Sequence, residues 1–328
     1  MIEQGSEPEL QALVEGVRAR RVRDVARAIT MVENQSAAGR TLMDALTDDE
    51  ETTRRARTIG LTGAPGVGKS TMTAALIAAY RELGLSVGVL AVDPSSPFSG
   101  GALLGDRIRM QSHSGDPDVF IRSMASRGHL GGLAATAGQV LRVFDAAGFD
   151  VVLIETVGVG QSEVEIAAAA DTTVVLVAPG MGDGIQAAKA GILEIGDVFV
   201  VNKADREGAQ TTARDLRQMI ALATNGDVWE PLVAVSVAST GEGVADVVAA
   251  IDAHYSWARD HGELDRRRIT RAREEIMSDL SGMVRAIANQ EPSVGEMDQA
   301  ARSVAHGHLT VHAAAERVWR VLRERDLG

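Results

Sequence analysis

The chain has 328 residues, of which 45% are hydrophobic and 3% aromatic, and its formal net charge is −12. A chain of this length can bury the core of one extended α/β domain with appended helices. The acidic balance and the scarcity of aromatic rings argue against a nucleic-acid partner, which requires basic patches or stacking platforms.

The chain contains no cysteine, which excludes disulfides, thiolate metal sites and cysteine nucleophiles. The first residues, MIEQGSEPELQALVEG, lack the basic and apolar regions of a signal peptide. The longest apolar stretches, such as VVLIETVGVG and TTVVLVAPGM, are too short and too interrupted to span a bilayer. We therefore expect a cytoplasmic protein with no membrane segment.

The first predicted elements are helices between about residues 7 and 47. Apolar side chains recur there at helical spacing, beside several arginines. We expect this N-terminal helical extension, residues 1–50, to pack on the main domain or on a partner. Its apolar positions are Leu10, Leu13, Val14, Val17, Val22, Val25, Ala28, Ile29 and Val32.

From residue 58 onward, short apolar runs alternate with helical segments. The runs are rich in β-branched residues, which is typical of parallel strands buried on both faces. We therefore predict an α/β domain, residues 51–260, with a mostly parallel seven-stranded sheet flanked by helices, and we expect a ligand at the carboxyl ends of the strands. The runs are TIGLT, SVGVLAVD, VFIRS, DVVLIE, TTVVLVA, DVFVVN and PLVAVS.

The residues GAPGVGKST follow the first strand, open a helix and match the phosphate-loop pattern G-x-x-x-x-G-K-[ST]. Glycines let the backbone turn its N–H groups toward a phosphate at a helix N-terminus. The pattern assigns Lys69 to the β- and γ-phosphates and the Ser70 hydroxyl to Mg²⁺. The sequence thus predicts a P-loop NTPase in which Lys69 also stabilises the charge that develops during phosphoryl transfer. The loop comprises Gly63, Ala64, Pro65, Gly66, Val67, Gly68, Lys69, Ser70 and Thr71.

Two acidic residues follow in the segment AVDPSSPFSGGALLGDRIRM. Asp93 stands at the end of the second strand, and Asp106 lies in a loop rich in glycine and serine. Such a loop can be ordered by nucleotide and Mg²⁺ and released after hydrolysis. Taken singly, either acid also fits a helix cap or a solvated turn.

The segment DVVLIETVGVGQSE places Glu155 at the end of a buried strand and Gly158 shortly after it. Glu155 takes the position of the acid, usually aspartate, that binds Mg²⁺ directly or through a water, and the longer side chain indicates a subclass. We expect the Gly158 N–H to contact the γ-phosphate. Gln161 is a candidate for orienting the attacking water, and a solvated loop glutamine is an equally good reading.

The tetrapeptide NKAD, directly after the strand DVFVV, is typical of guanine recognition. Asp205 can accept from N1–H and the 2-amino group, while Asn202 bonds the ring edge and the Lys203 stem lies along the base. Adenine lacks that donor pair, so ATP would leave a buried carboxylate unpaired at a cost of about 1–3 kcal/mol. We therefore expect GTP and GDP as the bound nucleotides. On the loop after the next strand, the expected supports of the base, through backbone amides, are Ser236, Val237 and Ala238.

Beyond about residue 260 the chain has the pattern of helical arms. The segment from Glu263 to Gln290 is one long charged helix whose row of apolar positions needs another surface. A final helix, VHAAAERVWRVLRERD, is apolar on one side. From periodicity alone, a cap on the same domain and a dimerisation arm over residues 261–328 are equally supported. The apolar positions of the long helix are Ile269, Ile276, Leu280, Met283 and Ile287.

Together these motifs resemble the methylmalonyl-CoA mutase-associated GTPases, the MeaB/MMAA family, whose bacterial members also carry the labels ArgK and lysine/arginine/ornithine transport ATPase. The resemblance covers nearly the whole chain. It implies a homodimeric GTPase that is a chaperone for an adenosylcobalamin-dependent methylmalonyl-CoA mutase, gating cofactor delivery from the adenosyltransferase and helping to protect or reactivate the mutase. The segments that carry it are GAPGVGKST, VDPSSPFSGGALLGDRIRM, FIRSMASRGHLGGLA, ETVGVGQSEVE and PGMGDGIQAAKAGILEIGDVFVVNKAD.

The resemblance also implies residue roles. For the segment PGMGDGIQAAK, it implies a mobile loop that couples the nucleotide state to the mutase through Asp183, Gln186 and Lys189. Spacing alone indicates only a Gly-rich turn and the start of a helix in this segment. The C-terminal arm corresponds to the family's dimerisation region. No arginine can be assigned as a finger, so we expect slow intrinsic hydrolysis that the partner accelerates. The acids that the resemblance links to Mg²⁺ are Asp93, Asp106 and Glu155.

Two other classes of protein compete with this interpretation. A nickel-delivery GTPase would bind its cargo through cysteine and histidine clusters, and the densest histidine group here is His306, His308 and His312, of which the last two could share a helix face. Surface histidines near a helix start are the better reading. A kinase, as the transport label suggests, would use ATP and give NKAD no purpose.

Overall fold

Two compact units make up the chain, Met1–Arg271 and Ala272–Gly328. Within the described residues, no helix is both long and apolar enough to cross a membrane. The residues described by the computed structural model are 7–34, 36–47, 55–94, 115–126, 132–156, 168–180, 193–223, 229–289 and 293–325.

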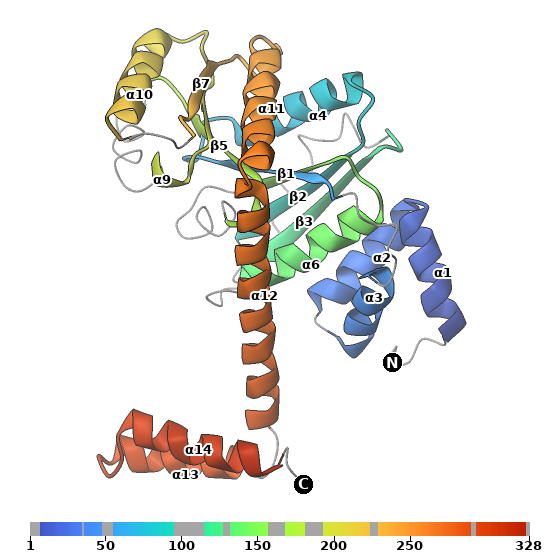
Figure 1. Cartoon of the computed structure of the whole chain (residues 1–328), viewed down its shortest axis with the longest axis vertical. Coiled ribbons are helices and arrows are strands. Elements are labelled where there is room, and N and C mark those ends of the chain that lie inside the picture. Colours follow the sequence, from blue (N-terminus) through green and yellow to red (C-terminus); the bar gives the residue numbers. More distant parts are fainter. Residues whose placement is uncertain are drawn as a thin grey trace. The chain divides into compact units, whose positions relative to one another are not determined.

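The first unit is built on a sheet that, over the described residues, has seven parallel strands in the order β3-β2-β4-β1-β5-β6-β7 (Figure 1). Each predicted apolar run forms one strand, which confirms the predicted α/β fold. The strands are β1 (Arg57–Thr62), β2 (Val87–Pro94), β3 (Val119–Ser126), β4 (Val151–Thr156), β5 (Thr172–Val177), β6 (Val198–Val201) and β7 (Leu232–Val235).

Strand β1 lies at the centre of the sheet, between β4 and β5. The register places Leu61 of β1 opposite Glu155 of β4 and opposite Val174 of β5. Because all the strands run parallel, their carboxyl ends meet at one edge of the sheet. The loops that follow β1, β6 and β7 therefore come together at that edge, next to the end of β4.

Helices cover both faces of this sheet (Figure 1). The helices between and after the strands are α4 (Lys69–Glu82), α6 (Gly132–Ala146), α9 (Leu193–Ile195), α10 (Ala209–Ala223) and α11 (Val244–Asp260). On one face, Leu76 and Ile77 share a buried cluster with Leu61 of β1. The opposite face carries two further buried clusters, one that includes Phe144 of α6 and one in which Phe199 of β6 packs with Leu216 of α10.

Three helices at the N-terminus, α1 (Glu7–Arg18), α2 (Val22–Glu33) and α3 (Ala37–Thr47), lie against α6 (Figure 1). Arg20, in the turn between α1 and α2, attaches this layer to the rest of the unit. Its guanidinium donates to the Ala147 carbonyl at 3.1 Å and to Asp118 at 3.0 Å. It also lies 4.8 Å from the centre of the Phe149 ring, a cation–π contact. The helical extension therefore packs on the sheet domain through both apolar and charged contacts.

The long helix α12 (Glu263–Ala288) begins in the first unit and continues into the second, in agreement with the predicted charged helix. In the second unit, α13 (Ser293–Ala305) packs on α14 (Val311–Arg325) around Ala300 and Val318. No predicted element corresponds to α13. His308 lies in the turn between these two helices, so the possible shared helix face with His312 does not form, and the three histidines are exposed, as the preferred reading has it.

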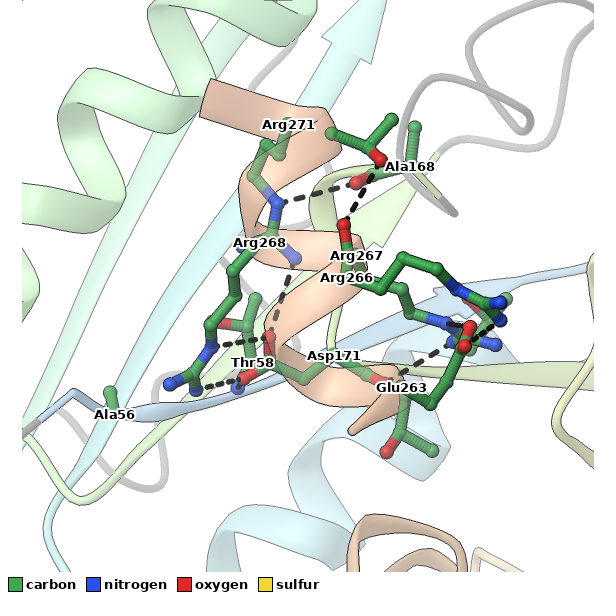
Figure 2. A network of polar contacts seen from close by, with 12 residues as sticks. Ala56, Thr58, Ala168, Asp171, Glu263, Arg266, Arg267, Arg268 and Arg271 are labelled. Carbon is green, nitrogen blue, oxygen red and sulfur yellow. Dashed lines mark hydrogen bonds and ion pairs between the residues drawn. The ribbon is translucent and has the colours of Figure 1, made fainter. Parts of the chain in front are cut away.

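Figure 2 shows how the first turns of α12 are attached to the amino edge of the sheet. Asp171, directly before β5, is buried, and its carboxylate accepts a hydrogen bond from Arg268 at 2.7 Å and one from Arg271 at 3.3 Å. The same carboxylate accepts the Thr58 backbone N–H at 3.2 Å. Arg271 also donates to the Ala168 carbonyl at 3.3 Å. One buried carboxylate thus links β1, β5 and α12.

A second buried carboxylate, Asp197, lies directly before β6 and repeats this arrangement. Arg267 donates two hydrogen bonds to it, at 2.7 and 2.8 Å, and the Thr173 N–H donates a third at 2.8 Å. His254 lies 3.2 Å away and its other ring nitrogen is 2.9 Å from the Thr172 hydroxyl. Burial disfavours the charged carboxylate, but the hydrogen bonds from Arg267 and the nearby His254 ring outweigh it and hold the pKa of Asp197 below its ordinary value.

Replacing Arg267 with methionine is expected to lower the free energy of unfolding at pH 7 by about 3 kcal/mol, because the buried Asp197 loses its bidentate partner. A carboxyl whose pKa is depressed by folding stabilises the folded state above its unfolded pKa, about 3.9 for aspartate, and loses that contribution as the pH falls through the folded value. The stability difference between the two proteins should therefore shrink below about pH 4. This stability difference can be measured by urea unfolding at several pH values, with tryptophan fluorescence as the signal.

Arg266→Met is the matched control, because Arg266 is exposed and pairs with Glu263 on the helix surface. Loss of this surface ion pair should lower the free energy of unfolding by less than about 0.5 kcal/mol. Equal losses in the two variants, or a difference that stays constant with pH, would contradict the role assigned to Asp197.

Candidate nucleotide-binding site

The predicted site residues lie partly within the described ranges. The phosphate loop, Glu155, the NKAD loop and the loop after β7 are all described. Of Asp93, only the backbone at the end of β2 is described. The predicted residues outside the described ranges are Asp106, Gly158, Gln161, Asp183, Gln186 and Lys189.

The phosphate loop runs from the end of β1 to the first turn of α4, and two of its positions require glycine. Gly68 precedes α4 with a φ of 97°, and a Cβ there would lie 2.5 Å from Asn202 Nδ2. Gly63 has a φ of 139°, and a Cβ there would lie 2.3 Å from the Leu176 carbonyl oxygen. Any side chain at these positions would be both strained and blocked. The glycines therefore let the loop pass close to β5 and to the loop after β6.

Lys69 and Ser70 form the first turn of α4, where the direction of the backbone N–H groups and the helix dipole favour an anion. Both side chains are buried. The Lys69 ammonium donates to the Gly63 carbonyl at 2.6 Å and to the Ala64 carbonyl at 3.2 Å. A phosphate in the loop is a stronger acceptor than these carbonyls, because a bond between two charged groups is stronger than one to a neutral acceptor.

Glu155, the second-last residue of β4, faces the same helix. Its Oε1 accepts the Ser70 hydroxyl at 2.6 Å, and its Oε2 accepts the Thr73 hydroxyl at 2.8 Å. The structure thus brings Ser70 and Glu155 together, and their role in binding a metal stays a prediction. Thr73 was not predicted. Its position three residues after Ser70, on the same helix face, is the sequence signal that identifies it.

Asn202 joins three loops. Its Nδ2 donates to the Val67 carbonyl at 2.9 Å, and its Oδ1 accepts the Ala238 N–H at 3.0 Å. Lys203, next in the chain, has a φ of 58°, an uncommon conformation for a residue with a side chain, and its ammonium donates to the Gly66 carbonyl at 2.5 Å. The NKAD loop is therefore bound to the phosphate loop at two points.

Asp205 is exposed at this edge of the sheet, and no hydrogen bond or ion pair to its carboxylate is found within the described residues. In the loop after β7, the Ser236 N–H donates to the Val201 carbonyl and the Val237 N–H to the Glu242 carbonyl, each at 2.9 Å. With the Ala238 amide bound to Asn202, all three amides have acceptors within the chain. Direct contact of these amides with a base stays a prediction.

These contacts define what the site can bind. The curved loop, the first turn of α4 and the Lys69 ammonium together suit a polyphosphate. The Ser70 hydroxyl and the Glu155 carboxylate are oxygen donors, the type that Mg²⁺ prefers. The Asp205 carboxylate suits a base that presents two adjacent N–H donors. It lies three residues after Asn202, which bonds the phosphate loop.

Comparisons with known proteins agree with this geometry. A family model described as methylmalonyl Co-A mutase-associated GTPase MeaB matches residues 25–291. The chain is 44% identical over 314 residues to a proposed GTPase of Pyrococcus horikoshii, covering 94% of this chain and 97% of that protein. It is 31% identical over 327 residues to the mitochondrial methylmalonic aciduria type A homolog of Caenorhabditis elegans, covering 94% and 82%. The solved structure of a LAO/AO transport system kinase matches with a TM-score of 0.70 at 26% identity, covering 98% of this chain and 99% of that chain.

Gly68→Ala is expected to weaken nucleotide binding at least about tenfold, because the new Cβ displaces Asn202 from Val67 and strains the loop by about 1 kcal/mol. Titration with a fluorescent GDP analogue measures the affinity. Gly84→Ala is the matched control, since Gly84 also has a positive φ, 75°, but a Cβ there meets nothing within 4 Å. Equal affinities for Gly68→Ala and the unchanged protein would contradict this assignment of the loop.

Proposed function

The chain belongs to the family of methylmalonyl Co-A mutase-associated GTPases, and from this premise we propose that it is a GTP-dependent chaperone of an adenosylcobalamin-dependent methylmalonyl-CoA mutase. The chain is a GTPase, so it binds and hydrolyses a guanine nucleotide. The observation that carries the proposal is the family match over residues 25–291, because this range contains the phosphate loop, Glu155 and the NKAD loop.

The proposal gives each loop a part in nucleotide binding. The phosphate loop, Gly63 to Thr71, surrounds the phosphates, and Lys69 turns from its carbonyl acceptors to the β- and γ-phosphates. Asp205 accepts from N1–H and the 2-amino group of guanine. Asn202 keeps this base-reading loop against the phosphate loop, which its bonds to Val67 and Ala238 support. Recognition of base and phosphate would thus be mechanically linked.

The Ser70 hydroxyl and Glu155 would hold Mg²⁺, directly or through water, and Asp93 and Asp106 would be linked to the same ion. When bound, the ion supplies positive charge against the β- and γ-phosphate oxygens. Lys69 would add positive charge near the β-phosphate, where negative charge develops as GDP leaves. We propose in addition that the Gly158 N–H contacts the γ-phosphate and that Gln161 orients the attacking water.

Hydrolysis in this proposal is a timer for the mutase. GTP orders the loops around its γ-phosphate, the mutase responds to that state, and hydrolysis ends it. The chain would gate loading of the cobalamin cofactor, received from the adenosyltransferase, and would protect or reactivate the mutase in the cytoplasm. Asp183, Gln186 and Lys189 are the residues proposed to couple the nucleotide state to the mutase.

A homodimer formed through α12 is part of the proposal. Four apolar side chains of α12 are between 49% and 59% exposed: Ile269, Ile276, Leu280 and Met283. Their spacing of seven, four and three residues places them on one helix face, as in the apolar seam of paired helices. A second copy of the same helix would cover this face by symmetry.

Two alternatives remain as competing proposals. A metallochaperone for another metalloenzyme would need ligands for its cargo, and the chain has no cysteine. A kinase linked to amino-acid transport is suggested by the name of one similar solved structure, LAO/AO transport system kinase. Kinase activity would require a phosphorylated product and a preference for ATP, which the Asp205 carboxylate opposes.

Asp205→Asn is expected to weaken GTP binding about a hundredfold and to strengthen XTP binding, because asparagine offers one acceptor and one donor, which match N1–H and O2 of xanthine. Competition titrations with GTP, XTP and ATP measure the change. Asp246→Asn, an exposed acid in the first turn of α11, is the control and should leave all three affinities unchanged. Unaltered GTP affinity in Asp205→Asn would mean that another group reads the base.

An adenosylcobalamin-dependent methylmalonyl-CoA mutase is expected to accelerate GTP hydrolysis by the chain at least about tenfold, because the chain lacks an assigned arginine finger and the partner would complete the site. Phosphate release with and without the mutase measures this, with ATP as the control nucleotide. Absence of acceleration, together with absence of a complex by gel filtration in every nucleotide state, would contradict the proposed client.

Ile276→Glu combined with Leu280→Glu is expected to convert a dimer to a monomer, because buried like charges would face each other across the seam. Light scattering after gel filtration measures the mass. Ser278→Glu adds a charge on the opposite side of α12 and should leave the dimer intact. A monomer for the unchanged chain would contradict the dimer directly.

A further inference from the structure

Two hydroxyl groups of α4 hold the two oxygens of one carboxylate. Ser70 donates to Oε1 of Glu155 at 2.6 Å, and Thr73 donates to Oε2 at 2.8 Å. Residues three apart lie on the same face of a helix, so both hydroxyls point toward the end of β4. Thr73 is 0% exposed and Glu155 is 4% exposed, so both groups are largely shielded from bulk solvent.

The Thr73 hydroxyl has one hydrogen and two acceptors within reach. The Glu155 contact at 2.8 Å is shorter than the contact to the Lys69 carbonyl at 3.1 Å. Threonine in a helix commonly bonds the carbonyl four residues earlier, so the second contact alone would be ordinary helix structure. The first contact is different, because it joins α4 to a buried charged group on a neighbouring strand.

A glutamate needs such a contact more than an aspartate does. Its side chain has one more rotatable bond, so the direction of the carboxylate is less determined by the strand that carries it. Fixing Oε2 against Thr73 leaves Oε1 directed at the Ser70 hydroxyl. The carboxylate is therefore held in one orientation by a residue two positions beyond the phosphate loop.

We propose that Thr73 is a positioning residue for GTP hydrolysis: its hydroxyl orients Glu155 so that Oε1 faces the metal position at Ser70. This rests on the proposed function, in which Ser70 and Glu155 hold Mg²⁺. Thr73 itself touches neither nucleotide nor metal in this assignment. Its removal should change how much Mg²⁺ the site requires and leave metal-free nucleotide binding intact.

The test compares Thr73→Val, which keeps the shape and removes the hydroxyl, with Thr73→Ser, which keeps the hydroxyl. The Mg²⁺ concentration at half-maximal GTP hydrolysis and at half-maximal slowing of fluorescent GDP release should rise about tenfold in Thr73→Val. Affinity for the same GDP analogue in EDTA should be unchanged. Thr73→Ser should restore both Mg²⁺ midpoints. If Thr73→Val does not fold, Thr73→Ala takes its place.

Glu155→Gln separates this proposal from the one it rests on. If Glu155→Gln leaves the Mg²⁺ midpoints unchanged, the assigned metal position is wrong and Thr73 has nothing to orient. If Glu155→Gln raises the midpoints and Thr73→Val does not, the positioning role alone is overturned. The double variant should match Glu155→Gln, because Thr73 acts through that carboxylate. Equal weakening of GDP binding with and without Mg²⁺ in Thr73→Val would mark a purely structural role.

Discussion

Parallel pairing of β1 with β4 is the constraint on which the nucleotide site depends. Glu155 reaches the hydroxyls of α4 because its strand lies directly beside the strand that leads into the phosphate loop, with Leu61 opposite it. One intervening strand would move the carboxylate by about 4.8 Å, which is beyond hydrogen-bond distance. The sheet order therefore decides that a distant acid and the phosphate loop share one site.

Charged side chains are arranged differently at the amino ends of the strands, here called the amino edge of the sheet, and at their carboxyl ends, the carboxyl edge. At the amino edge, Asp171 and Asp197 are buried, and each accepts both a strand N–H and an arginine of α12. At the carboxyl edge, Lys69 is held by loop carbonyls and Asp205 is exposed. These paired carboxylates attach the first turns of α12 to the sheet. At the second edge, the bonds of Lys69 to neutral carbonyls can be exchanged for stronger ones to a ligand.

Hydrogen bonds between the loops hold the parts of the site together. Asn202 connects the phosphate loop to the loop after β7, and Lys203 makes a second connection through Gly66. This connection restricts how the phosphate loop and the NKAD loop can move relative to each other. It also means that a change at the base-reading loop is transmitted to the phosphate loop through short, direct contacts.

The amino-acid sequence by itself determined the fold class and the local parts of the site. Seven β-branched runs were enough to predict the sheet, and the contiguous patterns GAPGVGKST and NKAD were enough to predict phosphate and guanine binding, because their chemistry depends on neighbours in the chain. Only the tertiary structure decided which distant residues meet. The contacts of Thr73 with Glu155, of Asn202 with Val67, and of Arg267 with Asp197 join residues between 70 and 135 positions apart. Strand order and helix placement bring such residues together, and no local pattern specifies either of them.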